Sequence, residues 1–402
     1  MKLVIVGASL AGLRAAEAAR KADADIQITL IGAEPHLPYD RPPLSKAFLD
    51  PGADVDGAPE PTHFRDEAYF AEHRIELRLG KPATELTGNQ VLLGGDAVDY
   101  DRLIVATGCT PRTLPGAEEL AGVHTLRTLD DAVAIRAALD AGSRTVVIGA
   151  GFIGSEIAAG AHKRGVPVTV LEALPVPLVR SVGEATGRAA TDLHAKHGLD
   201  LRCGVTMDGL VSEGGRVAGV RLTDGEVVAA DLVVIGIGVR PATEWLGTCG
   251  IALHDDGAIL CDETLATSLP NVWAAGDVAR FPHPLFDGVP LRLEHWTNAA
   301  EQGALAAKNA LHPDEAKPVT GVPYFWSDWY DSRIQFVGVP QADEIRVVSE
   351  ELGDDRFLAL HRRGERVTGC ITIDRPTQVM KYRRMVAQST SWSDAREFAG
   401  VS

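Results

Sequence analysis

The chain has 402 residues, of which 45% are hydrophobic and 23% charged, and its formal net charge at pH 7 is −16. This length and composition are typical of a globular protein of two or three domains, and the acidic balance argues against general nucleic-acid binding, which needs a basic face. The five cysteines are too far apart in sequence for a metal knuckle or a local redox disulfide. Neither a signal peptide nor a long apolar run is visible, so we expect a cytoplasmic protein with no membrane span and no bound metal.

A strand, a helix and a second strand are expected at about residues 3–7, 10–21 and 26–32. A βαβ unit with glycines in the pattern G-x-G-x-x-G binds a dinucleotide, because backbone N–H groups and the positive end of the helix dipole face the pyrophosphate. Here the triplet is Gly7, Ser9 and Gly12, so a serine replaces the second glycine. Glu34 stands at the distance expected of the acidic residue that binds the ribose. The unit predicts a nucleotide site in spite of Ser9.

A second unit of the same kind begins at residue 145. A β-branched run leads into Gly149, Gly151 and Gly154, and a helix and a second strand follow, ending at Glu172. One such pattern alone is weak, because it also fits a tight turn with close helix packing. Two complete units in one chain predict two dinucleotide sites, one nucleotide passing electrons to the other.

Three further segments have strands that end in small residues. Residues 101–112 and 231–246 each contain a strand followed by such a turn, where the chain could cross between domains. In 266–280, Gly276 and Asp277 follow another strand. An aspartate in this position either accepts a hydrogen bond from a ribityl hydroxyl or caps a helix, and the sequence alone leaves both open.

Several longer motifs then stand in a fixed order along the chain: PYDRPPLSK at 38–46, ATG at 106–108, GD at 276–277, LEHWTNAAEQG at 293–303 and PYFWSDWYDSRIQFVG at 323–338. Together with the two glycine loops they resemble the NADH-dependent ferredoxin reductases, FAD proteins that supply electrons to bacterial monooxygenases and dioxygenases. The resemblance covers nearly the whole chain. It departs from the family pattern at Ser9 and at Trp329, where many relatives are expected to carry glutamine.

The resemblance implies an α/β fold with two doubly wound Rossmann-like domains, on the glutathione-reductase plan, and a smaller α+β C-terminal domain. The FAD domain is expected at 1–109 and 241–320, the NADH domain at 110–240 and the C-terminal domain at 321–402. The residues themselves predict a hairpin around Gly364 within 357–374 and a linker at 312–323.

The resemblance also implies the residues that bind the two nucleotides, FAD and NADH. Among them, Trp296 would start a helix whose N-terminal dipole stabilises negative charge on the reduced flavin, although a core aromatic fits the sequence equally well. The complete set is Gly7, Ser9, Leu10, Ala11, Gly12, Glu34, Arg41, Pro42, Lys46, Ala83, Ala106, Thr107, Gly108, Arg112, Gly149, Gly151, Ile153, Gly154, Glu156, Glu172, Gly236, Gly238, Gly276, Asp277, Glu294, His295, Trp296, Phe325 and Trp326.

Lys46 and Glu156 are the expected catalytic residues. By resemblance, Glu156 lies on the nicotinamide side of the flavin, where it could pair with Lys46, orient the nicotinamide and adjust the flavin potential. The flavin would take a hydride from NADH and release the electrons singly to a 2Fe-2S ferredoxin. No protein nucleophile is required.

The expected partner is that ferredoxin, with a monomer as the default state. The alternatives are a rubredoxin reductase and a redox-sensing flavoprotein of the apoptosis-inducing-factor type. A pyridine-nucleotide disulfide reductase would need a cysteine pair beside the flavin, and the stretch after Glu34 has none. The tail at 355–402 is basic within an acidic chain, which makes it the candidate docking face for an acidic ferredoxin.

Overall fold

The computed structural model describes residues 1–52, 62–351 and 356–401, so parts of the predicted FAD and C-terminal domains lie outside it. The chain divides into two compact units, each built from three separate stretches. Unit 1 is Met1–Asp40, Thr62–Thr110 and Val239–Tyr324, and unit 2 is Arg41–Pro61, Pro111–Gly238 and Phe325–Ser402. Within the described residues, no helix is long and apolar enough to cross a membrane. The three-domain division stays a prediction.

Unit 1 is organised around a parallel sheet of five strands in the order β19-β7-β1-β2-β3. Their bounds are β1 Lys2–Val6, β2 Gln27–Ile31, β3 Ile75–Arg78, β7 Arg102–Val105 and β19 Val272–Ala274. Side chains alternate between the two faces of a strand, so Val4 and Val6 point to one face and Leu3 and Ile5 to the other. The Val4 face packs against a small antiparallel sheet that includes the buried Val91. That sheet consists of β4 Glu85–Thr87, β5 Gln90–Leu92 and β6 Ala97–Asp99.

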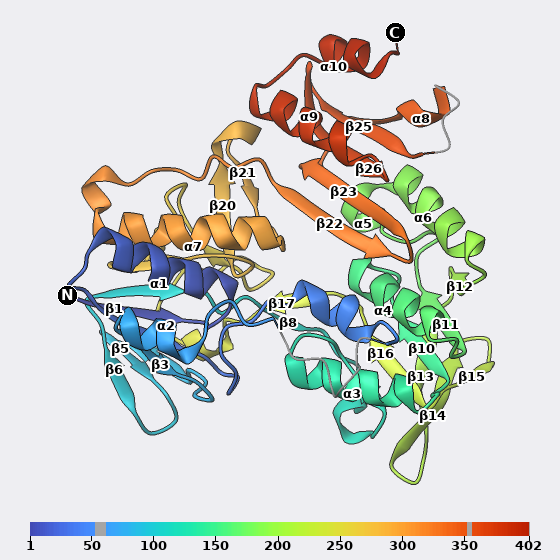
Figure 1. Cartoon of the computed structure of the whole chain (residues 1–402), viewed down its shortest axis with the longest axis horizontal. Helices are drawn as coiled ribbons and strands as arrows, with labels where there is room; N and C mark the ends of the chain where they lie inside the picture. The colour runs from blue at the N-terminus through green and yellow to red at the C-terminus, as the bar shows by residue number, and fades with distance from the viewer. Residues whose placement is uncertain (53–61, 352–355, 402) are drawn as a thin grey trace. The chain divides into compact units, whose positions relative to one another are not determined.

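The other face of the unit 1 sheet carries two helices, α1 (Leu10–Ala22) and α7 (Trp296–Leu311), which lie side by side in Figure 1. Gly303 allows their close approach, because a Cβ there would lie only 2.1 Å from the carbonyl oxygen of Ala11. Segments almost 300 residues apart in sequence thus cover one face together. The rest of unit 1 contains α2 Glu67–Glu72, β18 Ile259–Leu260, β20 Ala279–His283, β21 Val289–Leu291 and short 3-10 turns at Glu244–Leu246, Pro284–Phe286 and Pro313–Glu315.

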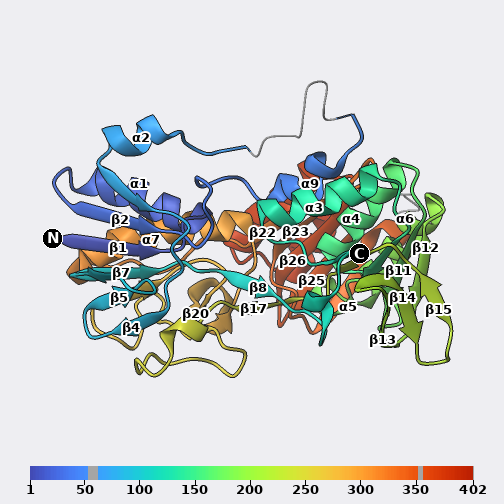
Figure 2. The same cartoon turned by 90° about the horizontal axis from the view of Figure 1, so that it is seen from below.

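Unit 2 contains a second parallel sheet, in the order β12-β11-β10-β16-β9. The strands are β9 Val123–His124, β10 Thr145–Ile148, β11 Val168–Glu172, β12 Asp200–Cys203 and β16 Leu232–Ile235. Val147 faces α4 (Phe152–Lys163), while its neighbours Val146 and Ile148 pack against an antiparallel sheet. That sheet is β13 Met207–Glu213, β14 Arg216–Leu222 and β15 Val227–Ala229. Figure 2 shows α4 next to α3 (Leu129–Asp140) along the strands.

The C-terminal part of unit 2 is a five-stranded sheet in the order β22-β23-β26-β25-β24. Its elements are β22 Tyr324–Trp329, β23 Ser332–Gly338, β24 Glu344–Val347, β25 Leu358–Arg363, β26 Arg366–Ile373, α8 Val348–Glu351, α9 Pro376–Ala387 and α10 Trp392–Ala399. β25 and β26 pair antiparallel up to Arg363 and Arg366, so the hairpin predicted around Gly364 is confirmed. One face of the sheet packs on α5 (Val179–Val182) and α6 (Glu184–Lys196), through Phe336 and Leu193 among others. Two parallel α/β sheets and an α+β part confirm the predicted fold class.

The segments predicted to cross between domains sit at the unit boundaries. Residues 101–112 form β7 and then β8 (Cys109–Pro111), and 231–246 form β16 and then β17 (Val239–Pro241). β8 and β17 pair with each other. In unit 2, the segment after Asp40 forms two 3-10 turns, η1 (Pro42–Ser45) and η2 (Ala47–Leu49), in which two consecutive prolines restrict the backbone.

Candidate functional site

The first glycine loop, in unit 1, is packed so tightly that two of its glycines are required. Gly7 has a φ of +118°, and a Cβ on it would lie 2.1 Å from the carbonyl oxygen of Ala106. A Cβ on Gly12 would lie 1.9 Å from the carbonyl oxygen of Gly7. Ser9 differs, because its φ of −117° and ψ of −161° are extended and suit any residue. The backbone therefore accepts the serine at the N-cap of α1.

The start of α1 has the features of an anion site. The Ser9 side chain does not cap the helix, and the first turn contains no acidic residue. The amides of a first helical turn have no partner within their helix, and they carry the positive end of its dipole. Leu10 and Ala11, both in the predicted set, belong to this turn. The loop is therefore suited to a phosphate group.

Two acidic side chains of unit 1 hold aromatic residues near the end of β2. Glu34 accepts a hydrogen bond from the Tyr39 hydroxyl at 2.6 Å, which fixes the orientation of its carboxylate. Asp40 accepts from the Trp296 indole Nε1 at 2.8 Å. Trp296 is thus held at the first position of α7 by a residue of the PYDRP motif, and the sequence reasoning had given Asp40 no role.

Gly276 and Asp277 follow β19 in unit 1, and both are held by their backbone. The Gly276 amide donates to Gln302 Oε1 at 2.8 Å, and the Asp277 carbonyl accepts from Arg292 at 3.4 Å. Gln302 is fully buried, and among the described residues its Nε2 has no hydrogen-bond partner. A buried amide with an unused donor fits a site that a polar ligand completes.

The remaining predicted residues of unit 1 lie around the same strand ends. Thr107 donates to the carbonyl of Ala242 at 2.8 Å, and Ala83 packs against the core under the sheet. Glu294 forms an ion pair with Arg292 at 2.7 Å. Burial lowers the pKa of His295 to about 4, so this histidine is neutral at physiological pH. Ala106 and Gly108 flank Thr107 at the end of β7.

The second glycine loop, in unit 2, has one glycine that the fold does not need. Cβ atoms on Gly149 and Gly154 would lie 2.5 Å and 2.1 Å from backbone oxygens. At Gly151, by contrast, φ is −73°, and a Cβ would meet nothing nearer than the carbonyl oxygen of Gly236, at 4.0 Å. The missing side chain leaves space open at the N-terminus of α4. Such a gap suits the close approach of a pyrophosphate.

Glu172 is tied to the second glycine loop by backbone amides. Its two carboxylate oxygens accept from the amides of Ala150, at 2.8 Å, and Leu174, at 2.9 Å. Each oxygen still has a lone pair for a ribose hydroxyl. Ile153, in the first turn of α4, is 45% exposed and offers an apolar surface beside the loop. The other predicted residues here, Gly238 and Arg112, bond to each other through their backbones at 2.9 Å.

Lys46 and Glu156 form a buried ion pair within unit 2. Lys46 Nζ lies 2.8 Å from Glu156 Oε2, and the two side chains are 18% and 4% exposed. Glu156 also accepts hydrogen bonds from two serine hydroxyls, Ser45 to Oε2 and Ser327 to Oε1. A buried carboxylate is stable only with such donors around it, so the four side chains act as one polar cluster.

The other predicted residues of unit 2 have structural contacts of their own. Arg41 donates to the backbone carbonyl of Arg127, and Pro42 begins the turn that carries Lys46. Phe325 packs edge-on against Phe152 with ring centroids 4.8 Å apart. Trp326 is the next residue of β22 and is partly exposed.

The structure brings the predicted residues together in two groups, one in each unit, and adds side chains that the sequence reasoning had missed. These are Asp40 and Gln302 in unit 1 and Ser45 and Ser327 in unit 2. All four lie within motifs that carry the resemblance, so the motifs contained the signal. Their partners are distant in sequence, and only the fold identifies them.

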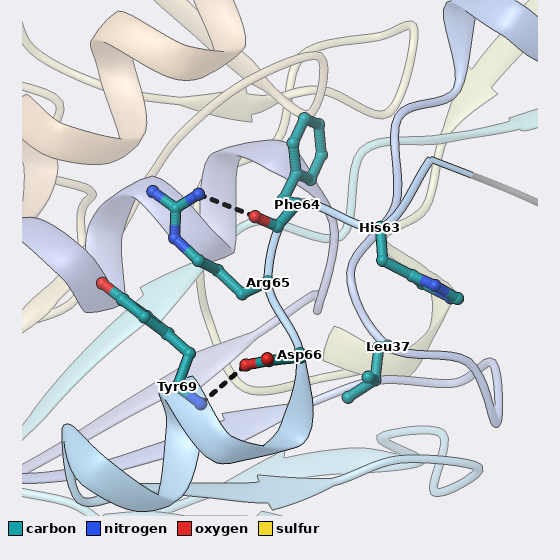
Figure 3. A pocket seen from close by; sticks show the side chains of 6 residues that line it. All are labelled: Leu37, His63, Phe64, Arg65, Asp66 and Tyr69. Atoms are coloured by element: carbon teal, nitrogen blue, oxygen red, sulfur yellow. Dashed lines mark hydrogen bonds between the residues drawn. The ribbon is translucent and has the colours of Figure 1, made fainter.

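A separate pocket of about 450 Å³ lies in unit 1, and no predicted residue lines it. Its lining is Leu37, His63, Phe64, Arg65, Asp66 and Tyr69 (Figure 3). The Arg65 guanidinium is already engaged, because it lies over the Tyr69 ring and pairs with Glu17 at 2.8 Å. The Arg65 side chain is therefore not available to bind an anionic ligand in this pocket, whereas the glycine loops offer backbone amides for that purpose.

Comparisons with known proteins agree with the two nucleotide loops. The pyridine nucleotide-disulphide oxidoreductase family matches residues 1–303, and the family described as reductase C-terminal matches residues 324–399. Rhodocoxin reductase of Rhodococcus erythropolis is 37% identical over 96% of this chain and 90% of its own length. The ferredoxin–NAD(+) reductase component of the p-cumate 2,3-dioxygenase system of Pseudomonas putida is 35% identical, over 97% and 94%.

A solved structure extends this similarity to the fold. The reductase in the crystal structure of the covalent putidaredoxin reductase–putidaredoxin complex superposes with a TM-score of 0.89, at 33% identity over 96% of this chain and 93% of that chain. These matches confirm the resemblance to the ferredoxin reductases. The chain belongs to the pyridine nucleotide-disulphide oxidoreductase family and carries the reductase C-terminal domain.

Proposed function

We propose that the chain is a ferredoxin–NAD(+) reductase, which takes a hydride from NADH onto bound FAD and passes single electrons to a 2Fe-2S ferredoxin that serves an oxygenase. The observation that carries this function is the pair of glycine loops, at residues 7–12 and 149–154, each followed by a glutamate at the end of its second strand. Two such loops bind two dinucleotides. The names of the relatives support a ferredoxin as the acceptor.

The residues of each unit fit the nucleotide assigned to it. In unit 1 the amides at the start of α1, the carboxylate of Glu34 and the buried Gln302 would hold FAD. In unit 2 the open position at Gly151 and the carboxylate of Glu172 would hold NADH. FAD, when bound, supplies a ring that accepts two electrons together and releases them one at a time.

Lys46 and Glu156 would orient the nicotinamide rather than exchange protons with it. The ion pair fixes the Lys46 ammonium, and three donors fix the Glu156 carboxylate. Groups held in this way lose no orientational freedom when the substrate binds, which favours the geometry needed for hydride transfer. Because the pair is buried, its charges are screened less than those of a surface pair.

A disulfide reductase needs two cysteines that react together, and the cysteines of this chain do not support that reading. None of the five cysteines, which all lie in the described part of the chain, forms a disulfide, and the thiols of Cys109 and Cys261 donate hydrogen bonds to the backbone carbonyls of Asp277 and Ile259. Burial raises the pKa of Cys261 to about 12, so its thiol is protonated at physiological pH. A ferredoxin reductase requires no cysteine.

We also propose that the protein is a cytoplasmic monomer that binds its ferredoxin transiently and binds neither nucleic acid nor a membrane. The net charge of −16 supports the absence of nucleic-acid binding. Light scattering of the purified protein tests the oligomeric state. A mass at twice that of one chain would contradict the monomer.

The function is tested by the spectrum and kinetics of the purified protein. We expect a yellow flavoprotein that NADH bleaches under anaerobic conditions and that then reduces a 2Fe-2S ferredoxin. The variant Gly151→Val fills the open space before α4, so NADH should no longer bleach the protein while dithionite still does. A protein without flavin, or one whose flavin NADH does not reduce, would overturn the proposed function.

A further inference from the structure

Trp329 is a fully buried side chain at the end of β22, and it contacts Ser327 of the polar cluster around Glu156. Its indole Nε1 donates a hydrogen bond to Ser327 Oγ at 2.8 Å, and Ser327 Oγ donates in turn to Glu156 Oε1. Trp329 therefore lies two hydrogen bonds away from the carboxylate and does not touch it.

The number of protons on each group fixes the direction of this chain of hydrogen bonds. An indole N–H can only donate, and a serine hydroxyl has one proton. Because Trp329 fills a lone pair of the Ser327 oxygen, the single proton of Ser327 is left for the Glu156 carboxylate. A donor to the hydroxyl oxygen also polarises the O–H bond and strengthens the next hydrogen bond.

The ring of Trp329 is held in this orientation by His194 of α6. The two rings are stacked, with centroids 4.7 Å apart and an interplanar angle of 18°. His194 itself is fixed at both nitrogens, by the Tyr330 hydroxyl at 2.9 Å and by Ser155 Oγ at 3.1 Å. The indole thus has no room to turn its N–H away from Ser327.

The other side of the carboxylate is occupied by Ser45 and Lys46, which both contact Oε2. Ser327 contacts Oε1, so it sets the rotation of the carboxylate plane relative to the Lys46 ammonium. Loss of its directed proton would leave one oxygen of a buried carboxylate without a fixed donor, which is costly and lets the group rotate.

We propose that Trp329 is a positioning residue for the hydride-transfer step: through Ser327 it aims a proton at Glu156 Oε1 and so fixes the Glu156 carboxylate against Lys46. This inference rests on the proposed function, because the cluster affects a rate only if NADH reacts beside it. The physical linkage from Trp329 to Glu156 does not depend on that function.

The kinetic test is a double-mutant cycle. Trp329→Phe keeps an aromatic ring against His194 and removes only the N–H, and Ser327→Ala removes the next link. We expect each variant to slow anaerobic reduction of the flavin by NADH about fivefold, the size of one net hydrogen bond, with the Kd for NADH within twofold of the parent. The double variant should be no slower than Ser327→Ala, because the two residues act in series.

Trp245→Phe is the matched control, because the Nε1 of Trp245 is buried and has no hydrogen-bond partner among the described residues. It should reduce at the parent rate. An unchanged rate for Trp329→Phe, or a double variant in which the two losses multiply, would overturn the inference and leave Trp329 a packing residue. If NADH does not reduce the flavin of the parent protein, the proposed function is wrong. The next measurement then tests whether Trp329 and Glu156 are linked by hydrogen bonds.

That measurement is the indole N–H spectrum of the protein labelled with ¹⁵N, which requires no turnover. The chain has six tryptophans, so six indole signals are expected. Trp329→Phe identifies one of them, and that signal should exchange slowly with solvent and shift in both Ser327→Ala and Glu156→Gln. The signal of Trp245 should stay in place. If the Trp329 signal does not shift in either variant, no directed proton links Trp329 to Glu156.

Discussion

Glu172 is the residue that should determine which coenzyme the enzyme prefers. Its carboxylate is fixed by the amides of Ala150 and Leu174, so its charge cannot turn away from a 2′-phosphate. We expect kcat/KM for NADH to exceed that for NADPH by at least about tenfold, the effect of one bond to a charged group. Steady-state rates with both coenzymes check this. Equal values would contradict this role of Glu172; if Arg180 of α5 then holds the phosphate, Arg180→Ala would remove NADPH activity.

Lys46 and Lys163 offer a comparison between a buried and an exposed ion pair. Lys46 pairs with the 4% exposed Glu156, whereas Lys163 pairs with Asp50 at 3.0 Å where both side chains are more than a third exposed. Lys46→Met leaves a buried carboxylate without its cation, so we expect hydride transfer at least about tenfold slower, with FAD still bound. Lys163→Met should change the rate less than twofold. Stopped-flow traces that are equal for the two variants would assign the buried pair to structure alone.

At this scale the sequence identified the charged residues and missed the residues that position them. Lys46 and Glu156 stand in motifs with a recognisable spacing. Two serines, Ser45 and Ser327, donate hydrogen bonds to Glu156 and come from segments about 280 residues apart. No sequence motif predicts this role for a serine. Burial gives them their role, because a hydroxyl becomes important only when water is absent.

Among the elements, the crossing of α1 and α7 depends on Gly303. Replacement of a helical glycine by alanine usually stabilises a helix by about 1 kcal/mol. Here the added methyl would lie 2.1 Å from the Ala11 carbonyl oxygen, so we expect Gly303→Ala to destabilise the protein by about 1–3 kcal/mol and to weaken FAD binding. Thermal unfolding and flavin content measure both effects. Lys308→Ala on the exposed side of α7 is the control and should leave both unchanged.

Helix α6 carries a histidine that should make the fold sensitive to acid. Burial lowers the pKa of His194 to about 4, against about 6.5 in an unfolded chain. Between these values His194 is protonated in the unfolded chain but not in the folded chain. The free energy of unfolding therefore keeps the full contribution of His194 above pH 6.5 and loses about 3 kcal/mol of it by pH 4.

The urea midpoint should therefore fall between pH 7 and pH 5. In His194→Phe the protein loses the two hydrogen bonds and is less stable at pH 7, but its midpoint should depend less on pH over this range. A pH dependence as steep as that of the parent would mean that other groups cause it, such as His295 or His361, whose pKa values burial also lowers to about 4.

The elements with strong local patterns could be predicted from the sequence, whereas the contacts between segments distant in sequence could not. The first βαβ unit and the hairpin of β25 and β26 have alternating or helical periodicity and clear turn glycines, and the structure confirms them. The segment after Asp40, expected within the FAD domain, clusters with unit 2, where the carbonyls of Phe48 and Leu49 accept from Arg136 and Arg164. No local sequence pattern predicts that Arg136 and Arg164 donate hydrogen bonds to this segment.

For the whole molecule, the distribution of charge predicts where the ferredoxin docks. The tail at 355–402 has a surplus of cations in an acidic chain, although its end residues 355 and 402 lie outside the described part. On α9, Lys381 and Arg384 are exposed, and Lys381 lies 5.5 Å from the centre of the ring of Phe398, which is also exposed. Such a basic and apolar face suits an acidic partner.

Reversal of Lys381 and Arg384 to glutamate should raise the KM for ferredoxin about tenfold at low ionic strength and weaken its dependence on salt. Reduction of the flavin by NADH should not change. The matched control reverses two exposed lysines of other helices, Lys21 and Lys196, which alters the net charge equally. If both pairs raise the KM alike, net charge and not a docking face is responsible, and if neither does, the ferredoxin binds elsewhere.

The order of strands in unit 1 has a consequence for biosynthesis. β1, β2, β3 and β7 leave the ribosome early, but β19, which pairs with the outer edge of β7, and α7, which covers α1, are translated only after the parallel sheet of unit 2. Until then the nascent chain exposes an open strand edge and the apolar side of a helix, which are features that chaperones bind and that promote aggregation. A gene cut at any point between β1 and β19 would leave neither half with the complete parallel sheet of unit 1, so an enzyme divided there cannot form that sheet within either half.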